Sequence, residues 1–332
     1  MGHVQRRQFL TAAGALLATP LARAQQRAQK VRRIGFLSPI AAPPPDAFPS
    51  PVFRDALRRR GYEVGKNLVI EARFAGGNLE RLGQLAEELV RLDVELIITA
   101  VNDATDAARK ATQKIPIVML ANFFVIERGA IASFARPGGN VTGTVYVMQP
   151  NEWLLKTFQL LKEAVPTAKR SAHIRHVDST WGFWDERALE HGNLALGMTS
   201  QLVPFRAPED LEAVFEQLKA ARPEVMHVSA GSFIPSFFKQ IAAFAIEHKI
   251  VSLSETATYT RAGGYLSYGL DLTELWDQVA SFVDRILLGA KPADLPVVQP
   301  TKFVLTMNGK TARAIGLKLP ESFMFRVDQV FE

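Results

Sequence analysis

The 332-residue sequence contains no cysteine. This absence excludes disulfide bonds, thiolate metal ligands and cysteine nucleophiles, and it also excludes a lipid anchor on an amino-terminal cysteine. Long apolar runs are missing as well, because none reaches the roughly 20 residues that a membrane-spanning helix requires. We therefore expect a chain that does not insert into a membrane and that burial alone stabilises.

The motifs of common cofactor and nucleophile sites are also absent. No Gly-x-Gly-x-x-Gly or Walker A sequence follows an expected strand, and no Gly-x-Ser-x-Gly sequence occurs. His173 and His176 are three residues apart on an expected strand, so their side chains point to opposite faces and a metal pair is not expected. His227 lies among apolar residues and is expected in the core. The sequence thus proposes no catalytic residue, metal or cofactor, and an enzyme stays open as an alternative to a binding protein.

The formal net charge of +6 does not indicate a nucleic-acid partner. Three of the basic residues, Arg6, Arg7 and Arg23, lie in the first 24 residues, which contain no acidic residue. The rest of the chain shows no clustered basic face of the kind that binds nucleic acid.

Residues 1–24 have the features of an export signal. Arg6 and Arg7 precede Phe9-Leu10, a short apolar core follows, and Ala22-Arg23-Ala24 has the small-x-small pattern of a cleavage site. The paired arginines resemble a twin-arginine leader, although Gln5 stands where Ser or Thr is more usual, and the ordinary secretory route is the alternative. We expect cleavage near Ala24, a linker over 25–32, and a periplasmic mature protein.

The remaining chain, about 300 residues long, suits two domains of roughly 150 residues each. Short apolar runs alternate with amphipathic helical segments, an order typical of doubly wound parallel α/β sheets. In the first half the expected strands are 33–38, 67–74, 95–100 and 115–120, and the expected helices are 53–60, 79–92 and 103–113. The pattern then restarts, with expected helices 153–164, 184–196, 211–221 and 237–248 and expected strands 170–177, 200–205, 225–230 and 250–254.

The C-terminal segment departs from this order. A long helix is expected over 272–288, a strand over 301–306, a short helix over 310–315 and a last strand over 324–330. These elements pack most economically if the chain recrosses between the two halves, which would form a multi-strand hinge. The expected lobes are 33–148 with 272–297, and 149–271 with 298–332.

Several segments, in this order, resemble a known family. They are Arg33-Ile34-Gly35-Phe36-Leu37-Ser38, Gly65 to Glu71, Arg136-Pro137-Gly138-Gly139-Asn140-Val141-Thr142-Gly143, Gly263 to Gly269 and Pro292 to Phe303. The sequence resembles the ABC-transporter substrate-binding family that includes tryptophan/tyrosine-binding proteins, from about residue 31 to 332. This resemblance implies a type I periplasmic binding protein fold, in which two Rossmann-like lobes enclose a cleft. It also implies a membrane ABC permease as the partner.

Open α/β sheets bind ligands at the carboxyl ends of their strands, so the loops at these ends are the candidate ligand contacts. The candidates in the first lobe are Ser38, Asn102, Asp103, Asn122, Phe123 and Tyr146. Those in the second lobe are Asp178, Trp181, Ser232, Glu255 and Tyr268.

Some candidates could have a structural role instead of contacting a ligand. Asn102 or Asp103 could cap the helix that follows, and Asp178 could do the same. Trp181 either stacks on a ligand ring or belongs to the core. Glu255 either pairs with a ligand ammonium group or is solvated. Tyr268 is favoured over Tyr265 as the tyrosine that faces the cleft.

The chain departs from the family pattern in three strand-end loops. Members commonly have a Gly/Thr-Pro type loop at Val101-Asn102-Asp103, Gly-Asp-Pro at Asn122 to Val125, and Asn-Pro at Val177-Asp178. This suggests that the ligand differs from an aromatic amino acid, with Phe123 and Phe124 either making the cleft apolar or closing it. We expect capture of a small carboxylate or amino acid-like ligand for a permease; a sensing module for a signalling receptor is the alternative.

Overall fold

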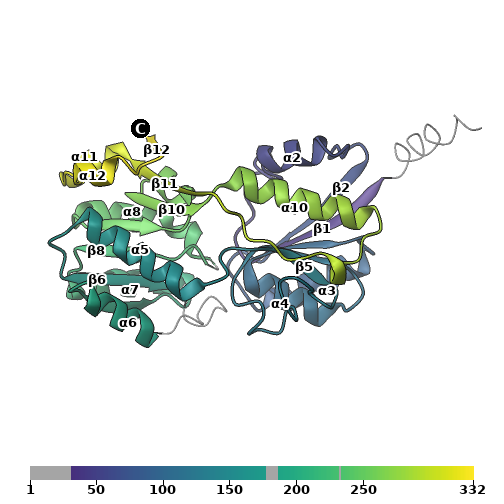
Figure 1. The fold of residues 1–332 in the computed structure, drawn as a ribbon, viewed down its shortest axis with the longest axis horizontal. Coiled ribbons are helices and arrows are strands. Elements are labelled where there is room, and N and C mark those ends of the chain that lie inside the picture. Colours follow the sequence, from purple (N-terminus) through teal and green to yellow (C-terminus); the bar gives the residue numbers. More distant parts are fainter. Residues whose placement is uncertain (1–30, 177–185, 232) are drawn as a thin grey trace, which may run out of the picture.

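The computed structural model describes residues 31–176, 186–231 and 233–332 (Figure 1). The expected leader and three candidate site residues, Asp178, Trp181 and Ser232, lie outside the described residues. No described helix is both long and apolar enough to cross a membrane.

The first lobe is built on a parallel sheet with strand order β2-β1-β3-β4-β5. Its strands are β1 (Arg32–Ser38), β2 (Leu68–Phe74), β3 (Ile97–Ala100), β4 (Ile117–Asn122) and β5 (Val141–Val145). Helices α3 (Arg81–Arg91) and α4 (Val101–Ala111) cover one face, and α2 (Pro51–Arg58) and α10 (Leu272–Leu287) cover the other. Burial on both faces explains why these strands are continuously apolar.

The second lobe contains a mixed sheet with strand order β12-β11-β10-β9-β8-β6-β7 among the described residues. Its strands are β6 (Arg170–Arg175), β7 (Thr199–Pro204), β8 (Val225–Val228), β9 (Val251–Ser254), β10 (Leu266–Leu270), β11 (Phe303–Asn308) and β12 (Gln329–Phe331). Strands β6 to β10 are mutually parallel, and β11 runs antiparallel to β10. The helices are α5 (Pro150–Ala164), α6 (Glu186–Ala195), α7 (Leu211–Ala221), α8 (Phe238–Glu247), α9 (Ala257–Arg261), α11 (Gly309–Ile315) and α12 (Glu321–Met324).

The described chain passes between the two sheets three times, which is visible as three connecting segments in Figure 1. It leaves β5 for α5, returns from β10 into α10, and leaves again through Val298, which pairs with Thr144 before β11 begins. Because α10 packs on β4 and β5, a helix late in the sequence completes the first lobe.

Most expected elements match the structure to within a few residues, but four elements differ. The strand expected over 324–330 is wrong for most of its length, because Pro320 starts the short helix α12 and only Gln329–Phe331 pairs with β11. Strands β5 and β10 and the five-residue helix α9 were not among the expected elements. Glycine interrupts both strands, at Gly143 and Gly269, and α9 is too short to show a helical period.

Candidate functional site

A cavity of about 280 Å³ lies where the carboxyl ends of both sheets face each other. Loops after β1, β3, β4 and β5 form one wall, loops after β8, β9 and β10 form the opposite wall, and α10 closes one side. Its lining residues are Ser38, Pro39, Ile40, Ala100, Val101, Leu120, Ala121, Tyr146, Ala230, Pro235, Phe238, Glu255, Thr256, Thr258, Leu270, Leu272, Leu275 and Trp276. The lining is mostly apolar, with a few polar groups, as is usual for sites that bind small molecules.

The first-lobe wall presents the amino end of α4. This helix begins at Val101 directly after β3; Ala100 in the N-cap position has no side chain that can cap it, and Asp103 lies in the first turn. Ala100 and Val101 both line the cavity. The amino end of a helix carries a partial positive charge, which favours an anionic group at this wall, and Asp103 in the first turn offsets part of that charge.

Ser38 adds a polar group beside this helix end. Its side chain is buried, and its Oγ atom has no hydrogen-bond partner among the described residues although it lines the cavity. A buried hydroxyl without a partner is costly. A ligand oxygen in the cavity would remove that cost.

Two lining residues of this wall have a strained backbone. Val101 has φ of 57° and Ala121 has φ of 56°, values that residues other than glycine rarely adopt. Two buried asparagines hold these loops: Asn102 Oδ1 accepts a hydrogen bond from the Phe123 N–H (2.9 Å), and Asn122 Nδ2 donates to Thr105 Oγ1 (2.7 Å). Strain of this kind is typical of ligand-binding loops that the surrounding structure fixes.

The second-lobe wall presents Glu255, the buried carboxylate after β9. Its Oε1 accepts a hydrogen bond from the Ala230 N–H at 2.6 Å. Its Oε2 lies 3.3 Å from His227 Nε2, without the geometry of a hydrogen bond. His227 in turn packs edge-on against His173, with ring centroids 4.8 Å apart. Burial lowers the pKa of His173 well below its ordinary value, and the neighbouring His227 and Arg175 add to this, so His173 is neutral.

Tyr146 connects the two walls. Its hydroxyl donates to the main-chain carbonyl oxygen of Glu255 at 2.6 Å, and its ring stacks on Phe123 with centroids 4.9 Å apart. Burial, followed by the charge of Glu255, raises the pKa of the Tyr146 phenol well above its ordinary value. The hydroxyl therefore keeps its proton and remains a donor.

Helix α10 contributes the apolar side of the cavity through Leu272, Leu275 and Trp276. The Trp276 ring packs against Phe53 of α2, with centroids 4.5 Å apart and planes inclined by 32°. The indole is thus held in place from behind and can offer its remaining surface to a ligand.

Comparison with known proteins identifies the family. Residues 48–331 match the model of a family described as ABC transporter substrate binding protein. The chain belongs to this family. It is a family of substrate-binding proteins and not of enzymes, which confirms the expectation from the sequence.

Individual relatives of this substrate-binding protein are distant. A tyrosine-binding protein of Clostridioides difficile is 24% identical over 275 residues, which cover 80% of this chain and 76% of that protein. A conserved domain protein of Vibrio cholerae has a crystal structure with a TM-score of 0.81 at 22% identity, covering 91% of this chain and all of that one. The crystal structure of a Streptococcus pneumonia domain in complex with L-Trp has a TM-score of 0.76 at 21% identity, covering 90% of this chain and 99% of that one. These structures confirm the expected α/β fold of type I periplasmic binding proteins.

The cavity of the substrate-binding protein brings together three of the candidate residues, Ser38, Tyr146 and Glu255. Asn102, Asn122 and Phe123 lie behind the first-lobe wall and do not line it. The remaining two described candidates lie elsewhere. Asp103 lines the groove between α3 and α4, and Tyr268 stacks on Phe303, with centroids 5.4 Å apart, beside the segment that connects the lobes.

Sequence reasoning did not find the helical part of the lining. Leu275, Trp276 and Phe238 lie within or at the start of helices, whereas all the sequence candidates come from strand ends. The sequence predicted that 272–297 returns to the first lobe, but it gave no reason to place the apolar face of this helix on the cavity.

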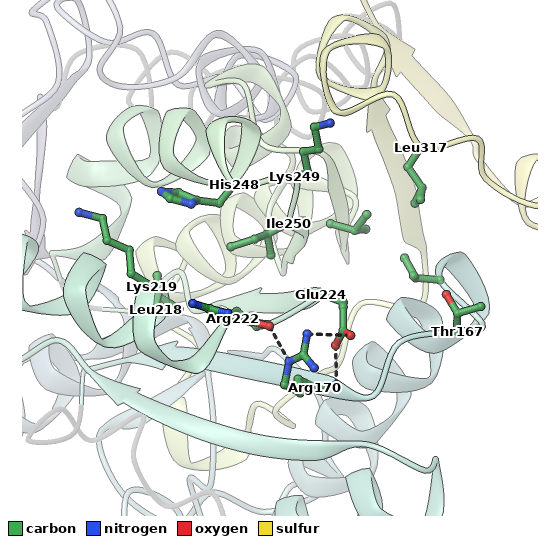
Figure 2. Close-up of a pocket in the computed structure, with 13 residues that line it drawn as sticks. Thr167, Arg170, Leu218, Lys219, Arg222, Glu224, His248, Lys249, Ile250 and Leu317 are labelled. Atoms are coloured by element: carbon green, nitrogen blue, oxygen red, sulfur yellow. Dashed lines mark hydrogen bonds and ion pairs between the residues drawn. The ribbon is translucent and has the colours of Figure 1, made fainter.

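The substrate-binding protein has a larger hollow, of about 620 Å³, at the opposite end of the second sheet (Figure 2). It lies by the first residues of β6, β8 and β9 and is lined by the second lobe alone. Figure 2 shows Arg170 occupied by its own neighbours: it pairs with Glu224 at 3.0 Å and donates to the Arg222 carbonyl at 2.7 Å. Because ligands of open α/β sheets bind at carboxyl ends, the smaller interlobe cavity is the better candidate site.

Proposed function

We propose that this protein is an exported solute-binding protein that captures a small carboxylate or amino acid-like ligand between its lobes and delivers it to a membrane ABC permease. Export would follow the twin-arginine-like leader 1–24, with cleavage near Ala24 and a periplasmic mature chain. The lobes would be 33–148 with 272–297, and 149–271 with 298–332.

The observation that carries this proposal is the opposition of charge across the cavity. The amino end of α4 and the unpartnered hydroxyl of Ser38 lie on one side, and the carboxylate of Glu255 lies on the other. A ligand carboxylate suits the first wall, and an ammonium group suits the second. A zwitterion would satisfy both walls at once.

The body of the ligand would lie against apolar surface. Leu272, Leu275 and Trp276 on one side, with Pro235 and Phe238 on the other, offer no charged group to a ligand side chain. We infer a ligand with an aliphatic or aromatic body. The distant relatives named for tyrosine and solved with L-Trp support a ligand of this size and shape.

The test is a thermal-shift and calorimetric screen of the mature chain with L-tryptophan, L-tyrosine, L-leucine, L-phenylalanine, 3-phenylpropanoate and benzoate. A compound that binds only the native state stabilises it by about 2.7 kcal/mol at 100 times its Kd. We expect at least one compound to raise the melting temperature and to bind with one-to-one stoichiometry. The proposal fails if none of the six shifts the melting temperature and none gives a binding isotherm.

A further inference from the structure

The two lobes are joined by the hydrogen bond from Tyr146 to Glu255, and they also touch at the edge of the cleft. Gly77, in the turn after β2, lies so close to Phe233 that a methyl group added at Gly77 would come within 2.8 Å of Phe233 Cβ and 3.5 Å of its Cγ. Only a residue without a side chain allows these two lobes to approach so closely. Gly77 also has φ of +88°, which glycine adopts without strain.

This contact lies at the opposite edge of the first sheet from the connecting segment that contains Val298. Strand β2 is one edge of the first sheet and β5 is the other, and it is beside β5 that Thr144 pairs with Val298 of a connecting segment. A rotation of the lobes about these segments would therefore separate Gly77 from Phe233 early. A contact of this type exists only while the cleft is closed.

Both residues are tied to the cavity walls. The Gly77 N–H donates to the Pro39 carbonyl at 2.8 Å and the Gly76 N–H donates to the Ile40 carbonyl at 3.1 Å, and Pro39 and Ile40 both line the cavity. On the other side, the lining residues Ala230 and Pro235 lie on either side of Phe233 in the sequence.

Phe233 cannot readily shift to make room for a side chain at position 77. It is buried in the core of the second lobe, where its ring meets Phe205 edge-on at 4.9 Å and His176 at 5.1 Å. Close-packed aromatic rings of this kind have no free space into which they can shift.

We propose that Gly77 and Phe233 are positioning residues that set ligand affinity without touching the ligand, because their contact forms only in the closed state. This inference rests on the proposed capture of a ligand between the lobes. The apparent affinity of a ligand that binds the closed form is proportional to the population of that form. A clash confined to the closed form lowers this population and therefore the apparent affinity.

The chain offers a matched control for the test. Gly76 is the preceding residue of the same turn and also has positive φ (+67°), but a methyl group there would have no atom within 4 Å. Gly76→Ala therefore imposes similar backbone strain without the clash. Because the chain has no cysteine, Gln84→Cys on α3 and Ala213→Cys on α7, both exposed, allow two spin labels to report the distance between the lobes.

We expect the labelled parent chain and Gly76→Ala to share a short-distance population, with or without L-tryptophan, L-leucine or 3-phenylpropanoate. Gly77→Ala should lose this population and bind the same compounds about tenfold or more weakly. Circular dichroism should show that all three are folded. Retention of the short distance in Gly77→Ala, or an equal loss in Gly76→Ala, would overturn the proposal.

A second measurement needs no bound compound. Gly77→Cys combined with Phe233→Cys should form an intramolecular disulfide under mild oxidation. Parting of the contact by about 1 Å brings the Cβ atoms to the roughly 3.8 Å that a disulfide requires, and the covalent bond then holds the lobes together, which Gly77→Ala cannot do. Absence of this crosslink would overturn the inference and leave the proposed function untouched. If the crosslink forms but no compound in the screen binds, the proposed function fails and the closing contact stands.

Discussion

The hydroxyl of Tyr146 donates a hydrogen bond of 2.6 Å to the main-chain carbonyl oxygen of Glu255, and this bond joins the two lobes at the cavity. Gly269 makes it possible, because a side chain there would place its Cβ 1.8 Å from the same carbonyl oxygen and 2.8 Å from the tyrosine hydroxyl. Removal of this donor is the simplest way to test how the lobes are held together.

Tyr146→Phe should lower the free energy of unfolding by about 1–3 kcal/mol, because a buried carbonyl loses its donor. It should also change ligand affinity, since the bond crosses between the lobes. Urea denaturation and calorimetry measure the two effects. Tyr259→Phe is the control: it removes a 2.7 Å bond to Ser252 inside the second lobe, so it should lower stability alone. Equal effects of the two variants on affinity would contradict this account.

Ser38→Ala should separate binding from stability. The Ser38 hydroxyl has no partner in the described structure, so its loss should leave the free energy of unfolding of the empty protein unchanged or higher. If the hydroxyl bonds a ligand carboxylate, affinity should fall about tenfold or more. Ser171→Ala is the matched control, because its hydroxyl bonds Asn193 within the second lobe at 3.1 Å. An unchanged affinity in Ser38→Ala would remove this residue from the site.

Glu255→Gln should reveal whether the ligand carries an ammonium group. Glutamine keeps the size of the side chain and can still accept the bond from the Ala230 N–H, but it carries no charge. L-phenylalanine and 3-phenylpropanoate differ only in the ammonium group and form the test pair. We expect the variant to weaken the amino acid selectively, as measured by calorimetry. An equal loss for both compounds would show that Glu255 has only a structural role.

The packing of α10 on the first lobe predicts a defined acid dependence. Asp277 pairs with Arg60 at 2.8 Å and with Arg59 at 2.7 Å, and the hydrogen bond from Arg60 is the main reason that the pKa of Asp277 falls to about 2. Since this is below the ordinary value of 3.8, the stabilisation is fully present above pH 3.8 and is lost as the pH falls towards 2.

Asp277→Asn should therefore lower the melting temperature near neutral pH, and its difference from the parent chain should shrink as the pH falls from about 4 to about 2. Arg60→Gln should remove most of the same acid dependence, because it removes the main partner and leaves only Arg59. Melting curves over this pH range measure both effects. A difference that is constant with pH would show that the ion pair does not stabilise α10 on α2.

The sequence predicted the sheets well because their strands are buried on both faces. Runs such as Ile34 to Leu37 and Val225 to Val228 have no polar alternation, which is typical of central parallel strands. Ser38, Tyr146 and Glu255 could be predicted for the cavity because Ser38 ends a strand and the other two directly follow one, and parallel strands end at one edge of a sheet.

The rest of the lining depended on backbone geometry and on the path of the chain. The positive φ angles of Val101 and Ala121 accompany a turn of Asn102 and Asn122 away from the cavity, where they brace the loops. The sequence did not predict these positive φ angles, because neither position is a glycine. Trp276 reaches the cavity only because the chain crosses back into the first lobe at α10.

The central claim is that the two lobes capture an intact solute between them. The most direct measurement incubates the mature chain with the six screening compounds at equal concentration, removes unbound material, and identifies by mass spectrometry what denaturation releases. The account predicts one compound, chemically unchanged, at one molecule per chain. Retention of none of the six, or release of a chemically altered product, would contradict it.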